Sequence, residues 1–172
     1  FGGAFAALYL IYTLQRFEAN ALAYGLLVAC GGVGALVGSF CASWCARRFG
    51  LRRTLIGSAL LHGLLSFCTP LAAGPMFVVF ALMALSQLFG DIGFAIYSIN
   101  EISLRQQLVP DHLLGRINAC MQMLSNGIMP LGALLAGLLS EIIGIRLTLL
   151  IGCVGIVLAP AWLFFSPLRR SL

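Results

Sequence analysis

The sequence predicts an all-α integral membrane protein whose six transmembrane helices form two inverted three-helix repeats. Three features support this prediction: the composition, the spacing of apolar runs, and a similarity between the two halves of the chain. Of the 172 residues, 61% are hydrophobic and 9% are charged, and the mean hydropathy is +1.05. A soluble domain is about 25% charged. So few charges cannot cover an aqueous surface, and lipid must therefore contact most of this one.

Six apolar runs approach the length of about 20 residues that a helix needs to cross a bilayer. Runs of this length can satisfy their backbone hydrogen bonds in lipid only as helices. The first run is short because the chain begins inside it, at Phe1, and we interpret the chain as a fragment that lacks its upstream part. The helices are predicted over residues 1–15, 21–46, 54–71, 75–98, 117–140 and 147–166.

The basic residues, all of them arginines, are distributed unevenly between the connections. If the connections alternate between the two sides of the membrane, one side holds Arg47, Arg48, Arg52, Arg53, Arg105, Arg116, Arg169 and Arg170. The other side holds only Arg16 and Arg146. Cytoplasmic loops are enriched in arginine, which predicts that the larger group and the C-terminus face the cytoplasm. The arginine-rich connection over residues 47–53 is too short for a nucleic-acid interface, and no nucleic-acid partner is expected.

An internal repeat supports the inverted arrangement. Shifting the chain by 94 residues aligns 37–56 with 131–150 without a gap. The turns share the pattern G-x-R-x-T-L, which pairs Gly50 with Gly144, Arg52 with Arg146 and Thr54 with Thr148. The charge distribution places these turns on opposite sides of the membrane. Inverted three-helix units of this kind are typical of secondary transporters.

The first of these turns resembles the cytoplasmic loop motif of the major facilitator superfamily, approximately G-x-L-x-D-R-x-G-R-[RK]-x-x-L. Residues 43–55 read "SWCARRFGLRRTL", and the positions on the pattern are Arg48, Gly50, Arg52 and Leu55. Arg47 stands at the acidic position, so the carboxylate–arginine clasp that the family motif implies lacks its acid. The second copy keeps the pattern at Gly137, Glu141, Gly144 and Arg146.

Two further stretches resemble the drug and siderophore exporter branch of this superfamily. Residues 103–119, "SLRQQLVPDHLLGRINA", are similar to the segment between the tenth and eleventh helices of these exporters and end in Pro110, Asp111, Gly115 and Arg116. The tail "FFSPLRR" (164–170) is similar to the ending of the family. Over essentially its whole length, the chain resembles the C-terminal half of a twelve-helix major facilitator fold.

This resemblance implies several properties that the residues alone do not give. The partner would be the missing N-terminal half, and a small hydrophobic or amphipathic compound would be exported between the halves, with H⁺ as the coupling ion and no other cofactor. The location would be a bacterial inner membrane. The cytoplasmic loop and gating residues would be Arg48, Gly50, Arg52, Arg53 and Arg116.

Asp91 lies inside the fourth predicted helix, in "QLFGDIGFAIYSINE". A carboxylate in the hydrocarbon region costs about 3 kcal/mol unless it is paired, hydrated or protonated. Two interpretations are open: a group that couples proton flow to transport, or a polar tether between helices. Gln87, one turn earlier on the same face, is a candidate for the substrate cavity.

The fifth predicted helix begins with a polar stripe, which contains Asn118, Gln122, Ser125 and Asn126. Amides in an apolar cavity suit a varied hydrophobic substrate, and we take Asn118, Gln122 and Asn126 as further cavity candidates. Hydrogen bonds between helices are the alternative role.

Other functional classes are less well supported by the sequence. Ser58 and His62 lie four residues apart, but this spacing rarely supplies the geometry of a catalytic triad, and no enzyme is predicted. The six cysteines are interpreted as apolar packing residues and not as metal ligands. The rival to a transporter is a six-span membrane scaffold or assembly subunit.

Overall fold

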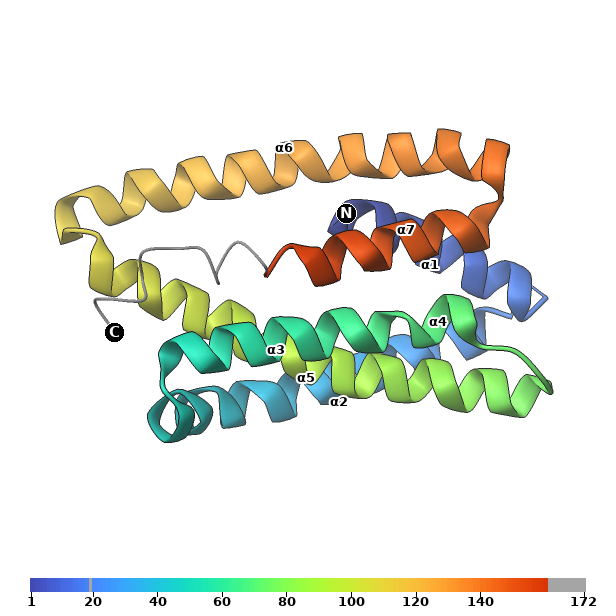
Figure 1. Ribbon diagram of the computed structural model, residues 1–172, viewed down its shortest axis with the longest axis horizontal. Helices are drawn as coiled ribbons and strands as arrows, with labels where there is room; N and C mark the ends of the chain where they lie inside the picture. The colour runs from blue at the N-terminus through green and yellow to red at the C-terminus, as the bar shows by residue number, and fades with distance from the viewer. Residues whose placement is uncertain (19, 161–172) are drawn as a thin grey trace.

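The computed structural model describes residues 1–18 and 20–160, and this part of the chain is helical with no strand (Figure 1). The helices are α1 (Gly2–Arg16), α2 (Ala21–Phe49), α3 (Leu51–Ser66), α4 (Cys68–Leu71), α5 (Met76–Leu108), α6 (Asp111–Ile143) and α7 (Ile145–Leu158). The end of the last predicted helix and the tail motif at 164–170, with Arg169 and Arg170, lie outside the described residues.

Four segments of the described chain are long and apolar enough to cross a bilayer. They are α2, α3 together with α4 (Leu51–Leu71), α5 and α6. The helix α7 is a shorter apolar helix of 14 residues, and α1 has 15 residues. The chain is therefore an all-α integral membrane protein, as predicted, and the count of six spans stays a prediction.

The predicted connections are much shorter in the structure. The helices predicted over 75–98 and 117–140 extend to Leu108 and begin at Asp111, so only Val109 and Pro110 separate them. Proline disfavours helical backbone at the residue before it, which ends α5 there, while the polar residues around it do not interrupt a helix in water. The arginine-rich connection of 47–53 is likewise helical, apart from Gly50.

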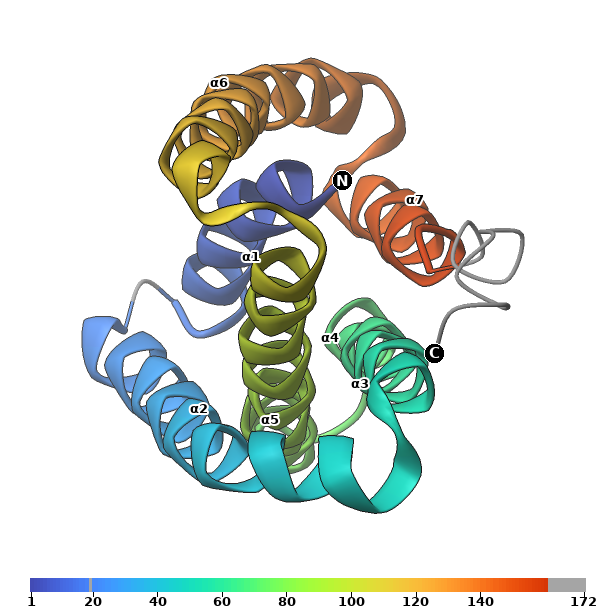
Figure 2. The same ribbon diagram turned by 90° about the vertical axis from the view of Figure 1, so that its left-hand side faces the viewer.

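Consecutive long helices run in opposite directions (Figure 1). One end of the bundle holds the α2–α3 and α5–α6 connections, and we call it the Gly50 end; it faces the viewer in Figure 2. The other end, the Gly144 end, holds the α1–α2, α4–α5 and α6–α7 connections. The helix α5 packs against α2 and α3, and α1 packs against α6 and α7.

Glycines bring α2 and α5 into backbone contact. A Cβ atom at Gly38 would lie 2.6 Å from the carbonyl oxygen of Ile92, and one at Gly34 would overlap the carbonyl of Leu88. On the other side of α5, a Cβ at Gly93 would lie 2.7 Å from the carbonyl oxygen of Ser58 in α3. Association in lipid depends on such close van der Waals packing because no hydrophobic effect drives helices together there.

Candidate functional site

The carboxylate of Asp91 lies over a glycine of the neighbouring helix. A Cβ atom at Gly31 of α2 would overlap Oδ2 of Asp91 and would lie 3.1 Å from Nε2 of Gln87. Gly31 therefore makes the space in which these two side chains of α5 sit. Within the described residues the only ion pair joins Arg105 and Glu101, so Asp91 has no cationic partner there. The structure thus brings Asp91 and Gln87 together, as the shared helix face predicts.

His62 contacts the adjacent face of α5. Its Nδ1 is 3.0 Å from the carbonyl oxygen of Gly90, and this geometry makes Nδ1 the hydrogen-bond donor. Its ring is 5.4 Å from the ring of Phe94. Ser58 instead donates to the carbonyl of Thr54 at 2.6 Å. Ser58 and His62 each form a hydrogen bond with a backbone carbonyl and not with each other, so they do not form a nucleophile–base pair.

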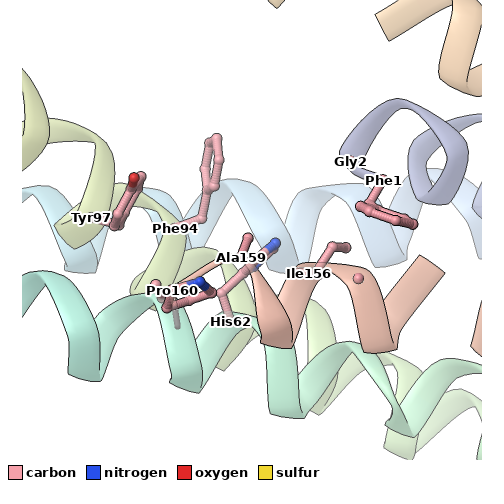
Figure 3. Close-up of a pocket in the computed structure, with 10 residues that line it drawn as sticks. Phe1, Gly2, His62, Phe94, Tyr97, Ile156, Ala159 and Pro160 are labelled. Carbon is pink, nitrogen blue, oxygen red and sulfur yellow. The ribbon is translucent and has the colours of Figure 1, made fainter. Parts of the chain in front are cut away.

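A cavity of about 480 Å³ opens beside His62, between α3, α5, α7 and the start of α1 (Figure 3). Its lining includes His62, Phe94, Tyr97 and Ile156. None of Gln87, Asn118, Gln122 and Asn126 is among its lining residues. The cavity is therefore separate from the residues that we expected to contact substrate. It is also bounded by Phe1, the first residue of the sequence.

The polar stripe of α6 lies on an open face of the bundle. Every residue from Asn118 to Leu131 is exposed, and Ala136 is the only buried residue of the helix. Asn118 accepts a hydrogen bond of 2.9 Å from Nη1 of Arg105, which also pairs with Glu101. Asn118 thereby ties α5 to α6, so a helix-joining role is visible for one of the three amides. Neither this stripe nor the pair of Gln87 and Asp91 lines the cavity beside His62.

The two turns of the internal repeat have the same backbone geometry. Gly50 has φ 82° and ψ 149°, and Gly144 has φ 85° and ψ 152°. Each glycine N–H donates at 3.0 Å to the carbonyl four residues earlier, that of Ala46 or Ser140. Each glycine carbonyl accepts at 3.0 Å from a threonine hydroxyl, Thr54 in one turn and Thr148 in the other. We call these turns the Gly50 junction and the Gly144 junction; they lie at opposite ends of the bundle (Figure 1).

The arginines that follow the two glycines have different contacts. The Nε of Arg146 donates to the carbonyl of Pro70, at the end of α3–α4, over 2.6 Å. The Nε of Arg52 is buried and has no hydrogen-bond partner in the part of the chain that the structure describes. Of the other motif residues, Arg48, Arg53, Arg116 and Glu141 are exposed and Gly137 is half-buried. The structure thus gathers the predicted loop residues at the Gly50 end but gives Arg52 no partner among the described residues.

Comparison with known proteins identifies the family. A model of the Major Facilitator Superfamily matches residues 1–171. The chain belongs to this superfamily. This confirms the family predicted from the loop motifs, and with it a membrane transporter of the major facilitator type. Comparisons with curated proteins and with solved structures gave no match.

The sequence reasoning missed several residues of this major facilitator protein. Gly31 extends the glycine stripe of Gly34 and Gly38 by one turn, so the sequence could have predicted a close helix contact there. The sequence could not predict that the carboxylate of Asp91 occupies the space beside it. No local signal connects Pro70 with Arg146, because the two residues are far apart in the sequence. Phe94 and Tyr97 are ordinary aromatic residues of an apolar helix until the cavity beside them is known.

Proposed function

We propose that the chain is the C-terminal half of a proton-coupled major facilitator exporter, in which α1–α3 and α5–α7 are inverted repeats. The observation that carries this proposal is the pair of junctions at Gly50 and Gly144, which share a backbone conformation and lie at opposite ends of the bundle. Substrate would bind between this half and an N-terminal partner half near the bilayer midplane, and the halves would rock about it.

The packing of the helices supports the same arrangement. Exchanging α1, α2 and α3 for α5, α6 and α7 turns the α2–α5 contact into the α6–α1 contact, and the α3–α5 contact into the α7–α1 contact. All four contacts are present, as are the α2–α3 and α6–α7 contacts that the exchange also relates. The exposed polar face of α6 is then the side on which a partner half and a substrate would lie.

Orientation follows from the arginines in this proposal. The Gly50 end carries Arg47, Arg48, Arg52 and Arg53 and would face the cytoplasm of a bacterial inner membrane, with the C-terminus on the same side. To test this, single cysteines replace Arg53 and Arg146, both of them exposed, in a full-length protein without its six native cysteines. A membrane-impermeant maleimide on intact cells should label the variant at 146 and spare the variant at 53. Labelling of both from the same side would overturn the inverted arrangement.

Asp91 is the proposed coupling residue. Its carboxylate lies between α2 and α5 without a cationic partner in the described chain, so the cost of its charge in lipid favours proton uptake whenever the site is closed to water. Gln87 lies beside it and is the nearest proposed substrate contact.

The test of coupling compares Asp91→Asn with Glu101→Gln in the full-length protein. In inverted vesicles energised with a proton gradient, with the hydrophobic cation ethidium as the probe, Asp91→Asn should abolish proton-driven uptake at normal expression. Glu101→Gln removes a carboxylate that is paired with Arg105 and should retain uptake. Unchanged uptake by Asp91→Asn would remove this residue from the mechanism and leave it as a helix tether. Membership of the superfamily favours transport over the scaffold alternative.

A further inference from the structure

An apolar groove of about 350 Å³ lies at the Gly50 end, where α2, α3 and α5 meet. It is lined by Cys45 and Phe49 of α2, Arg53, Gly57 and Leu61 of α3, and Ile96 of α5, together with two hydroxyl residues. Gly57 is exposed and has open space where a side chain would begin. The groove is separate from Asp91 and from the cavity beside His62.

The two hydroxyl residues of the groove do not make it polar. Thr54 donates to the carbonyl of Gly50 at 3.0 Å, and Ser58 donates to the carbonyl of Thr54 at 2.6 Å. Both donors are thus used within α3. The groove therefore offers a hydrocarbon surface below a single charged side chain, that of Arg53.

The arginines at the Gly50 junction form no ion pair with the described residues. No acidic residue occurs in the sequence between Glu18 and Asp91, and the only ion pair of the described residues is at Arg105. Arg52 and Arg53 lie in the first turn of α3, which has no side-chain cap. A helix N-terminus is electropositive, so cations there are unfavourable and an anion is favourable. Next to Arg53 in the sequence, Arg52 has a buried Nε with no hydrogen-bond partner within the described residues.

The Gly144 junction shows how a protein group satisfies the equivalent arginine. Arg146 also lies in the first turn of its helix, and it donates to the carbonyl of Pro70. Glu141, three residues before Gly144, adds an acid to that junction. At the Gly50 junction the corresponding residue is Arg47, so the local chain adds positive charge where the other copy adds negative charge.

Two aromatic side chains mark the depth of this site in the bilayer. Trp44 and Phe49 are 56% and 54% exposed, and their rings lie 5.9 Å apart. Exposed tryptophan is enriched at the level of the lipid headgroups. Arg47 and Arg48 lie between these two residues in the sequence, and Arg52 and Arg53 follow within four residues, so the arginines lie near the level where lipid phosphates are found.

We propose that this groove is a binding site for an anionic phospholipid. One acyl chain lies along Gly57 and Leu61, and the phosphate is held by Arg52 and Arg53 at the N-terminus of α3. Charge complementarity selects the lipid, because an arginine that lines a hydrocarbon groove matches an anionic headgroup with an attached chain. Three further arginines lie at the same end of the bundle, and none of the four forms an ion pair within the described residues. The lipid supplies the negative charge that the Gly144 junction obtains from Glu141.

The experiment measures lipid retention by native mass spectrometry of the purified protein, released from nanodiscs that contain equal amounts of phosphatidylglycerol and phosphatidylethanolamine. The wild type should retain phosphatidylglycerol in preference. Each arginine near a lipid surface contributes about fivefold to binding, so the Arg52→Gln/Arg53→Gln double variant should retain about 30-fold less. Gly57→Leu leaves the arginines unchanged but fills the groove, and it should reduce retention by a similar factor.

Two matched controls separate this site from general effects. Gly25→Leu makes the same change at another exposed glycine with open space around it, and Arg146→Gln removes the repeat-related arginine; both should retain lipid like the wild type. Equal retention of the zwitterionic lipid would overturn the proposal. Loss in the double variant with no loss in Gly57→Leu, or displacement by glycerol phosphate, would show an anion site without a lipid chain.

Discussion

At the Gly50 junction and at the Gly144 junction, a single glycine ends one long helix and begins the next with nearly equal backbone angles. In each turn a threonine hydroxyl donates to the carbonyl of the glycine four residues earlier, at 3.0 Å in both. The arginines differ, because Nε of Arg146 donates to the carbonyl of Pro70, whereas Nε of Arg52 has no partner within the described residues. The repeat thus preserves the local turn, whereas the contact of the arginine depends on which distant helix end lies beside it.

The same contrast extends to the helices that enter the junctions. Gly38 of α2 and Gly132 of α6 are related by the repeat, but a Cβ at Gly38 would lie 2.6 Å from a backbone oxygen, whereas one at Gly132 would lie 3.4 Å from its nearest neighbour. The close glycine contact between α6 and α1 lies on α1 instead, where a Cβ atom at Gly3 would overlap the carbonyl oxygen of Met129. Both seams therefore contain a close glycine contact, but the repeat-related glycine of α6 has more room than that of α2, and α6 is largely exposed.

The largest effect is expected from alanine at Gly38, and the same change at Gly132 is its matched control. Gly38→Ala must push α2 away from the backbone of α5, and overpacking of this kind costs about 3 kcal/mol, or a fall of about 10 °C in melting temperature. Gly132→Ala should change it by less than about 3 °C. Thermal stability in detergent, followed by size-exclusion chromatography, measures both, and equal falls would show that the two repeat-related positions are packed alike.

Alanine at the junction glycines should have a somewhat smaller and equal effect. The conformation of Gly50 and Gly144 is accessible almost only to glycine, and other residues cost about 2 kcal/mol there. Gly50→Ala and Gly144→Ala should each lower the melting temperature by about 6 °C in the same assay. A large difference between them would mean that the shared backbone angles do not reflect equally constrained turns.

The arginines should separate the junctions. Arg146→Gln loses the hydrogen bond to Pro70, worth about 1 kcal/mol, and should lower the melting temperature in a neutral detergent by about 3 °C. Arg52→Gln loses no hydrogen bond in the described structure and should leave it unchanged there. Added phosphatidylglycerol should stabilise the wild type and Arg146→Gln more than Arg52→Gln. The reverse order in neutral detergent would contradict the assignment of contacts.

The smallest effect is expected from the threonines. Thr54→Val and Thr148→Val each remove one hydroxyl that donates to a glycine carbonyl, at a cost of about 0.5 kcal/mol. The two shifts in melting temperature should agree within about 1 °C. Disagreement would show that the surroundings of the two junctions, and not the turn itself, determine the contribution of the threonine.

The local sequence determines the class of this protein and the position of its two glycine turns. Low charge and long apolar runs determine a membrane protein because the bilayer accepts only backbone that satisfies itself. Gly50 and Gly144 determine sharp turns because few other residues adopt their backbone angles, and the residues around them were enough to predict the superfamily. The ends of α5 and α6 were predicted poorly, since polar residues that leave the membrane can still be helical.

The contacts between distant segments depended on the tertiary structure. Gly31 receives the carboxylate of Asp91, and Arg146 reaches Pro70, 76 residues away. Neither partner can be read from spacing along one helix, because the rotation and depth of each helix are set by all of its neighbours at once. For the same reason, the sequence did not show that the polar stripe of α6 lies on an open face while Gln87 and Asp91 lie against Gly31 of α2.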